Sequence, residues 1–372
     1  MITTSSLTLS ETIKELIKEN GPISFYAFME IALYAPETGY YTSTKDKIGI
    51  NGDYYTSPII TPLLGKMIGK QLEEMWHMLD KKAFAIVEYG AGSGSLCHDI
   101  LLHLKDNKEL YKDLTYYIIE KSPSARQKEK TLLTEKVSWI ESISDIAPIK
   151  GCILSNEVLD NFPIHRVVMK DELMEVFVGY QDGFYELLCP APKAVKEYFK
   201  ELNVHLPKNF CTEVNLDAIE WVKEIAGCLQ KGFVLTIDYG YPSNELYRIN
   251  KRLGTLVSYN KHTLNNSPYT DIGKQDITSH VNFSALHHWG LKYGLDYCGF
   301  TNQAYFLLAL GLNEYLRKIE NDAPHANLSE EQKAFFTNTF LADMGSKLKV
   351  FIQQKGMSPQ KPLGVRFSAR ML

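Results

Sequence analysis

The sequence predicts an α/β protein built on a Rossmann-like parallel sheet. An apolar run at residues 84–87 ends in Glu88, and apolar residues at helical spacing begin at Leu96. Between them lie three glycines at alternate positions, Gly90, Gly92 and Gly94. A second apolar run at residues 116–119 ends in another acid, Glu120. A strand, a glycine turn, a helix and a second strand in this order make up a βαβ unit, from which such sheets are built.

The glycine turn predicts close contact between the backbone and a ligand. Glycine has no Cβ to hold a ligand away, and the N–H groups at the start of the next helix can bind a carboxylate or a phosphate. Dinucleotide-binding proteins carry G-x-G-x-x-G/A, whereas this turn reads E-x-G-x-G-x-G and has Ser95 at the third small position. This spacing is closer to the S-adenosylmethionine turn of class I methyltransferases. A glycine turn without a ligand is the other interpretation.

Glu120 is predicted to bind ribose hydroxyls. A βαβ unit places an acid at the end of its second strand, where a carboxylate offers two oxygens to a vicinal diol. Alternatively, Glu120 caps the helix expected near Pro123, a position that Ser122 could also fill. An adenosyl group and a dinucleotide would both use this acid. Glu120 therefore indicates an adenosine-containing ligand without distinguishing the two.

The chain divides into three predicted parts. They are an N-terminal helical extension with a substrate-side loop, a cofactor-binding core and a mostly helical C-terminal region, at residues 1–80, 81–240 and 241–372. Further core strands are expected at 137–140, 151–155 and 233–237. Apolar residues alternate between turn residues at about 165–190, which predicts a β-meander inserted after the fourth strand.

Helices are expected on both sides of the core. In the extension they cover residues 11–19, 26–34 and a stretch from residue 62 onward, and Ser10 is predicted to cap the first of them. In the C-terminal region, helix-period patterns cover residues 283–293, 303–319 and 330–354.

The segment SNEVLDNFPIH places polar residues directly after the fourth strand. Ligands of open α/β sheets bind at the carboxyl ends of the strands, so Asn156 is expected beside the cofactor. Glu157 and Asp160 are the catalytic candidates, because two carboxylates suit a cationic acceptor such as a guanidinium and one can accept its proton. Alternatively, these acids complement the dipole of a helix N-terminus.

Two loops outside the core carry candidate substrate-binding residues. Tyr55 lies in GDYYTSP, and Asp276 and His280 lie in QDITSHVNF. Loops often carry binding residues on such scaffolds. The alternatives are that Tyr55 is a packing aromatic and that His280 is a hydrogen-bonded structural histidine.

Composition narrows the classes of partner. A formal charge of −4 and an isoelectric point near 6.2 give no bulk attraction to nucleic acid. The six cysteines form no C-x-x-C pair, so we expect no metal site. No run approaches the length of a membrane span, which leads us to expect no membrane insertion. The cysteine usage and an N-terminus without a signal peptide or an Arg-rich presequence lead us to expect a cytoplasmic protein.

The ordered motifs resemble the MidA-like family over nearly the whole chain. They are GYYTSTKDKIGINGDYYTSP, VEYGAGSGSL, SNEVLDNFPIH, QDITSHVNF and TNQAYFLLALGL. That family comprises bacterial proteins and the mitochondrial complex I assembly methyltransferase. Two positions differ from the family pattern, because Ile59 and Asn282 stand where acids are usual. We expect both in cleft segments, where they would affect the choice of substrate.

The resemblance implies a class I methyltransferase that uses S-adenosylmethionine and releases S-adenosylhomocysteine. The acceptor it implies is a protein side chain, with the arginine guanidinium first, and the oligomeric state is left open. It also implies cofactor contacts at five positions, Glu88, Gly90, Gly92, Gly94 and Glu120. The rival functions are a dinucleotide-dependent oxidoreductase, which the glycine spacing disfavours, and a non-catalytic assembly factor that retains the fold.

Overall fold

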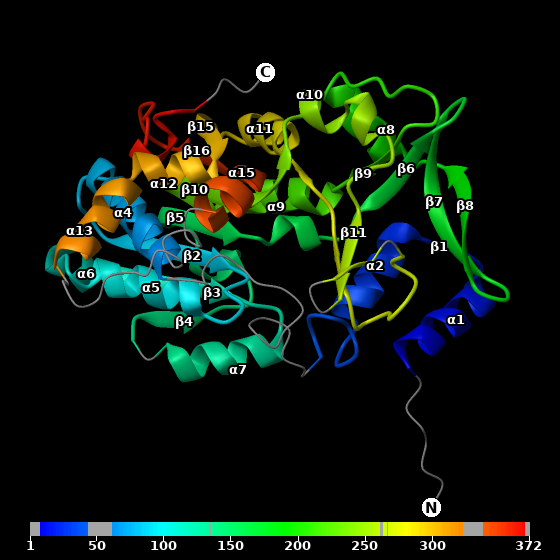
Figure 1. Ribbon diagram of the computed structural model, residues 1–372, viewed down its shortest axis with the longest axis horizontal. Helices are drawn as coiled ribbons and strands as arrows, with labels where there is room; N and C mark the ends of the chain where they lie inside the picture. Colours follow the sequence, from blue (N-terminus) through cyan, green and yellow to red (C-terminus); the bar gives the residue numbers. More distant parts are fainter. Residues whose placement is uncertain are drawn as a thin grey trace, which may run out of the picture.

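The central sheet has the strand order β15-β16-β10-β5-β2-β3-β4, with β14 beside β10 (Figure 1). The computed structural model describes residues 8–43, 62–133, 135–260, 263–265, 267–322 and 338–368. Five neighbouring strands are parallel, namely β4 (Val137–Trp139), β3 (Leu114–Ile119), β2 (Phe84–Tyr89), β5 (Ile149–Asn156) and β10 (Leu229–Tyr241). The expected Rossmann-like core is confirmed, and the carboxyl ends of these strands meet at one edge of the sheet.

Helices cover both faces of this sheet. Alternate residues of β2 point to opposite faces, so Ile86 packs with α4 (Leu63–Met78) and α5 (Ser95–Leu104), while Val87 packs with α9 (Leu216–Cys228) and α11 (Phe283–Lys292). Two further helices, α6 (Lys108–Asp113) and α7 (Pro123–Leu132), follow α5 and β3 in the chain. None of the described helices has the length and apolar character needed to cross a bilayer.

A second, antiparallel sheet confirms the predicted insertion and extends it. β6 (His165–Met169), β7 (Leu173–Tyr180) and β8 (Phe184–Pro190) form the meander. β9 (Cys211–Val214) pairs with β6, and β1 (Ile23–Ser24) of the N-terminal extension pairs with β7. The helix α8 (Lys193–Glu201) lies between β8 and β9 in the chain.

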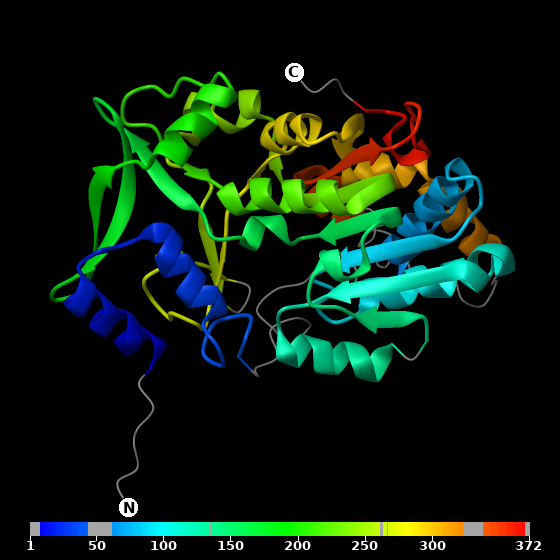
Figure 2. The same ribbon diagram turned by 180° about the vertical axis from the view of Figure 1, so that it is seen from behind.

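The N-terminal helices pack against this second sheet. α1 (Leu9–Asn20) and α2 (Phe25–Tyr34) share an apolar core with β7. Figures 1 and 2 show this part at one end of the molecule, facing the carboxyl edge of the central sheet. Thr8 caps α1, whereas Ser10 lies inside the helix, so the predicted cap is wrong. A hydroxyl at either position fits the capping pattern, and Thr8 has Glu11 three residues later to complete a capping box.

A third, small sheet connects the C-terminal third to the core. It consists of β11 (Val257–Asn260), β12 (Thr263–Asn265) and β13 (Asp276–Thr278). The chain then passes from β13 through β14 (Val281–Asn282), which pairs in parallel with the end of β10. Residues 276–282 therefore run along the carboxyl edge of the central sheet.

The helix expected at 330–354 is wrong from residue 348 onward, and residues 330–337 lie outside the described residues. β16 (Leu348–Lys355) lies between β10 and β15 (Asp296–Asn302), antiparallel to both, and is preceded by the short helix α15 (Met344–Lys347). A strand covered on both faces is apolar at nearly every position, so its periodicity cannot be told from that of a buried helix. The helix expected at 303–319 is also two helices, α12 (Gln303–Ala309) and α13 (Leu312–Asp322), separated at Gly311 by a φ of +90°.

The close approach of β2 and β5 gives a first prediction. A Cβ on Gly151 of β5 would lie 1.9 Å from the carbonyl oxygen of Ala85, and the φ of Gly151 is +151°. Because that neighbour is backbone, we expect Gly151→Ala to lower the free energy of unfolding by about 2–4 kcal/mol in urea titrations.

The matched control is Gly227→Ala in α9. A Cβ there meets nothing within 4 Å, so alanine should leave stability unchanged or raise it by up to about 1 kcal/mol. Equal unfolding midpoints for the two variants would contradict the proposed strand packing.

Candidate functional site

The glycine turn after β2 is left-handed at all three glycines. Gly90, Gly92 and Gly94 have φ values of +64°, +60° and +77°. Gly94 is the N-cap of α5. A Cβ on Gly90 would lie 3.0 Å from Cγ2 of Val158, so the turn also sits close to the segment that follows β5. The sequence prediction of a turn that requires glycine is confirmed, and the N–H groups at the start of α5 lie at its end.

Glu120 connects the glycine turn to the end of β3. Its carboxylate accepts hydrogen bonds from the backbone N–H groups of Ser122 at 2.7 Å and Gly92 at 3.4 Å. Burial raises the pKa of the Glu120 carboxyl, and these N–H groups partly oppose the shift. Ser122 caps α7, because its hydroxyl accepts from the N–H of Ala125. The cap position is therefore filled by Ser122, and the Glu120 carboxylate is held against the turn.

Glu88 is a buried residue of β2, the strand that leads into the glycine turn. Its side chain is 2% exposed and accepts a hydrogen bond from the hydroxyl of Tyr116 on β3 at 2.7 Å. Burial raises the pKa of the Glu88 carboxyl to about 7, against the lowering effect of the Tyr116 hydrogen bond. A direct contact between Glu88 and the cofactor stays a prediction.

Beyond β5, the chain turns sharply around Asp238 of β10. Glu157 has a φ of +54°, which non-glycine residues rarely adopt, and its N–H donates to the carbonyl of Ile237. One carboxylate oxygen of Asp238 accepts from the N–H groups of Val158 and Leu159, at 3.2 and 2.9 Å. The other oxygen accepts from the N–H of Tyr239 at 2.8 Å. Asp238 is fully buried and fixes the turn that carries Glu157 and Asp160.

Asp160 is buried with an unused oxygen. Its side chain is 5% exposed, and Oδ1 has no hydrogen-bond partner within the described residues. Burial raises the pKa of the Asp160 carboxyl well above its usual range, and the carboxylates of Asp238, Asp276 and Glu157 raise it further. Burial also raises the pKa of Asp238, to about 7. A carboxylate with a free oxygen and carboxylates around it is suited to a cationic ligand.

Asp276, the first residue of β13, is one of the acids that act on Asp160. It is 4% exposed and accepts a hydrogen bond from the hydroxyl of Tyr41 at 2.8 Å. The Tyr41 hydroxyl in turn accepts from Nδ2 of Asn161 at 2.5 Å. Tyr34 stacks on Tyr41, with ring centroids 5.6 Å apart, and donates to the Asn161 carbonyl. We call the four acids Glu157, Asp160, Asp238 and Asp276 the acidic cluster.

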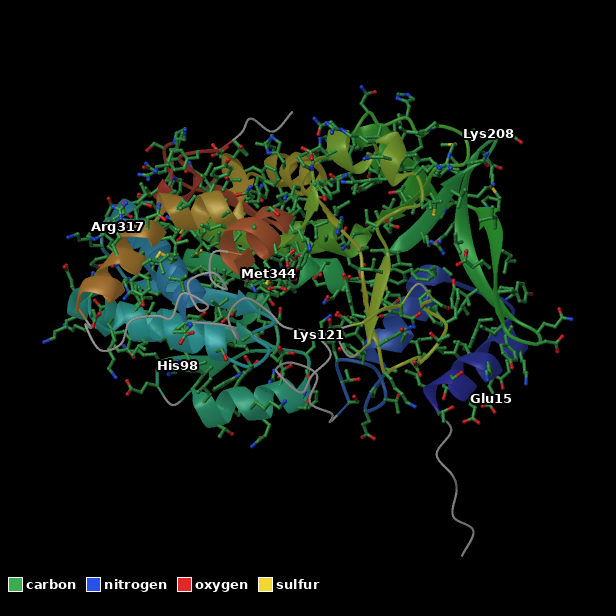
Figure 3. The ribbon with its side chains drawn as sticks, in the orientation of Figure 1. Glu15, His98, Lys121, Lys208, Arg317 and Met344 are labelled. Atoms are coloured by element: carbon green, nitrogen blue, oxygen red, sulfur yellow. The ribbon has the colours of Figure 1, made fainter. Side chains whose placement is uncertain are left out.

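Sequence reasoning missed three residues of this site, Asp238, Tyr34 and Tyr41. Asp238 carried the signal used for Asn156, because it also ends an apolar strand at the carboxyl edge. The tyrosines carried no such signal, since only the fold brings α2 to this edge. Figure 3 labels Lys121 in the same region, and its Nζ lies 5.7 Å from the centroid of the Tyr34 ring.

Some predicted substrate residues lie elsewhere. His280 sits beside Tyr241, with ring centroids 5.3 Å apart, rather than in the acidic cluster. Asn282 is not a cleft residue: its side chain caps α11 by accepting from the N–H groups of Ser284 and Ala285, and it is 8% exposed. An asparagine fills that position as well as an aspartate does, which explains the residue without reference to substrate. Tyr55 and Ile59 lie outside the described residues.

Asn156, the last residue of β5, lies between the turn and the acidic cluster. Its Nδ2 donates to the carboxylate of Glu157 at 3.3 Å. Its Oδ1 is buried and has no partner within the described residues. The described residues also hold no group of three or more His, Cys, Asp or Glu side chains arranged for a metal ion.

Comparison with known proteins shows which family shares this fold. A family model of S-adenosyl-L-methionine-dependent methyltransferases matches residues 67–301. A crystal structure of a Burkholderia thailandensis protein bound to S-adenosyl-homocysteine superposes with a TM-score of 0.87 and 28% identity, over 97% of this chain and 95% of that one. The chain belongs to the MidA-like methyltransferases.

Relatives of this methyltransferase cover most of its length. The mitochondrial protein arginine methyltransferase NDUFAF7 homologue of Drosophila melanogaster is 24% identical in an alignment of 385 positions that covers 94% of this chain and 85% of that protein. The Caenorhabditis elegans homologue of the same name is 27% identical in an alignment of 380 positions that covers 92% of this chain and 85% of that protein. The class I fold expected from the sequence is confirmed.

S-adenosylmethionine is the cofactor of this methyltransferase, and the glycine turn fits it. The turn has no Cβ at Gly90, Gly92 and Gly94, so a ligand can approach its backbone there. The Glu120 carboxylate is held by two N–H groups and suits ribose hydroxyls. The buried, unpartnered Oδ1 of Asn156 is an acceptor that a ligand at this edge would satisfy.

Glu120 gives the prediction for cofactor binding. Glu120→Gln removes the charge but keeps the size of the side chain, so affinity for S-adenosylhomocysteine should fall by about 1.5–3 kcal/mol in calorimetric titrations. The control is Glu141→Gln, because Glu141 is 81% exposed and its carboxylate pairs with Arg126. Equal affinities in the two variants would place the ribose contact on another residue.

Proposed function

We propose that this methyltransferase modifies a guanidinium nitrogen of a protein arginine. The observation that carries the proposal is the acidic cluster next to the glycine turn. The charged groups that act most strongly on Asp160 are all carboxylates, so a positively charged acceptor would relieve both the burial and the mutual repulsion. The relatives named as protein arginine methyltransferases support the same acceptor.

Within the acidic cluster, the hydrogen bonds indicate different roles for Asp238 and Asp160. Asp238 uses both oxygens on backbone N–H groups, so it holds the turn and is a positioning residue. Oδ1 of Asp160 has no hydrogen-bond partner among the described residues, and we assign Asp160 to the guanidinium together with Glu157. Two carboxylates can hold the planar guanidinium through charge-assisted hydrogen bonds, which aligns one nitrogen.

Proton transfer follows from the same arrangement. When bound, S-adenosylmethionine supplies an electrophilic methyl group. A guanidinium nitrogen that accepts a methyl group must lose a proton, and a carboxylate with a raised pKa is a stronger base than an exposed one. Asp160 meets that description through its burial and its three acidic neighbours. Tyr34 and Tyr41 close one side of the cluster and help to exclude water.

The two rival functions lose support. The dinucleotide-dependent oxidoreductase rested on the glycine turn and Glu120, which suit both ligands, whereas the relatives of this chain are methyltransferases. A non-catalytic assembly factor would have no use for a buried carboxylate whose Oδ1 finds no partner in the described part of the chain. Turnover is therefore the better account of Asp160.

The activity prediction concerns Asp160 and Glu157. Asp160→Asn and Glu157→Gln should each lower methyl transfer at least about a hundredfold, because a charge partner or base is lost. Affinity for S-adenosylhomocysteine should barely change. The assay follows tritium from S-adenosylmethionine into arginine of proteins in a lysate that lacks this methyltransferase. Asp182→Asn, in the exposed turn between β7 and β8, is the matched control.

Stability provides a second readout of the Asp160 variant. A carboxyl whose folded pKa is raised stabilises the protein below its unfolded pKa and loses that contribution as pH rises toward the folded pKa. Asp160→Asn should therefore be more stable than the wild type at pH 8, by on the order of 1–2 kcal/mol, and gain less at pH 5. Full activity of Asp160→Asn would refute the assignment, as would lower stability at both pH values together with lost cofactor binding.

A further inference from the structure

A second group of charged side chains lies at the end of β10, and the proposed function does not use it. The Nζ atoms of Lys251 and Lys349 lie 2.8 and 5.5 Å from the centroid of the Tyr241 ring. The ring of His280 lies 5.3 Å from the same centroid. We call Tyr241, Lys251, His280 and Lys349 the basic cluster. It combines an aromatic face with three nitrogen groups that can bind an anion.

The lysines of the basic cluster have no direct ion-pair partner among the described residues, and Glu245 is the acid that acts on both of them. Within the described residues, Lys349 donates only to the carbonyls of Ser346 and Lys347. Burial lowers the pKa of both lysines, and Glu245 is the acid that opposes this shift for each.

His280 adds an unsatisfied group to the same place. Its Nδ1 is buried and has no hydrogen-bond partner within the described residues. Burial and the two lysines lower the pKa of His280 to about 4, so the imidazole is neutral at pH 7 and can donate one hydrogen bond to an anion. Among the described residues, a buried nitrogen without a hydrogen-bond partner lies next to two ammonium groups that form no direct ion pair, and this points to a ligand with negative charge.

The basic and acidic clusters lie on the same two chain segments. Along β10, Tyr241 comes three residues after Asp238, and His280 comes four residues after Asp276. Ser279 joins the two clusters directly, because its N–H donates to the carbonyl of Asp160 at 3.0 Å. Three residues of extended chain span roughly 10 Å. A bound peptide would cross that distance in about three residues of its own.

We propose that the basic cluster binds a side-chain carboxylate of the substrate about three residues away from the modified arginine. The identity of the cation in the acidic cluster rests on the proposed function, whereas the preference for an acidic residue rests on Lys251, His280 and Lys349. A lysine ammonium group is a compact charge on a flexible side chain. It can therefore follow a carboxylate on a mobile peptide side chain without a fixed planar geometry. The acidic cluster would bind the arginine of a peptide, and the basic cluster would bind an acidic residue at a fixed distance from it.

The test uses synthetic nine-residue peptides with one central arginine in a glycine–serine background. Glutamate or glutamine is placed at each other position in turn, and binding to the S-adenosylhomocysteine-bound protein is measured by calorimetry. We expect glutamate about three positions from the arginine to bind about tenfold more tightly than glutamine there. Lys251→Gln/Lys349→Gln should lose this preference. Lys347→Gln should keep it, since Lys347 pairs with Asp343.

A charge-reversal variant controls for the chance that the double glutamine variant loses the glutamate preference through misfolding. Lys251→Glu should prefer lysine over glutamate at the same peptide position, with unchanged S-adenosylhomocysteine affinity and unchanged thermal unfolding. Equal binding of glutamate and glutamine peptides by the wild type would overturn the proposal, as would a preference that survives in the double variant.

Methyl transfer to the same peptides separates this inference from the proposed function. A glutamate preference in binding without any transfer to arginine would support the basic cluster and contradict arginine as the acceptor. Transfer to arginine without a glutamate preference would support the proposed function and overturn the basic cluster as a substrate site.

Discussion

Buried negative charge at the carboxyl edge of β5 and β10 is the constraint on which the rest of the structure depends. Removing carboxylates from water is costly unless hydrogen bonds or cations compensate. Asp238 is compensated by three backbone N–H groups, and Asp276 by the Tyr41 hydroxyl. Asp160 retains an oxygen without a partner in the described part of the chain. Burial of Asp160 lowers the stability of the protein without a ligand, and a bound cation would restore that stability. Such a cost in stability is common at functional sites.

Distant parts of the chain must meet for this charge to stay buried. β5 and β10 supply the turn and its support, β13 supplies Asp276, and the N-terminal extension supplies Tyr34 and Tyr41. The second sheet pairs with β1 from the same extension, so it anchors α2, which carries Tyr34 and leads into the turn with Tyr41. The β insertion therefore supports the residues around the acidic cluster, whereas Glu120 is held against the glycine turn.

The sequence predicts local features of this site well and long-range ones poorly. The glycine turn, Glu120 and the acids after β5 follow from one βαβ pattern and from the rule that ligands bind at strand carboxyl ends. The strand β16 was mistaken for a helix, because burial on both faces removes the alternation that marks a strand. Asp276 and His280 lie close in sequence but belong to different clusters, since the chain changes sheet between β13 and β14.

The most direct test of a cation-binding acidic cluster is the number of protons exchanged on binding. An arginine-containing peptide is titrated into the S-adenosylhomocysteine-bound protein at pH 7, in buffers of different ionisation enthalpy. A guanidinium should lower the raised pKa values of Asp160 and Asp238, so binding should release protons. The same peptide with citrulline in place of arginine should bind weakly and release none. Arginine binding without proton release, or equal binding of the citrulline peptide, would contradict the account.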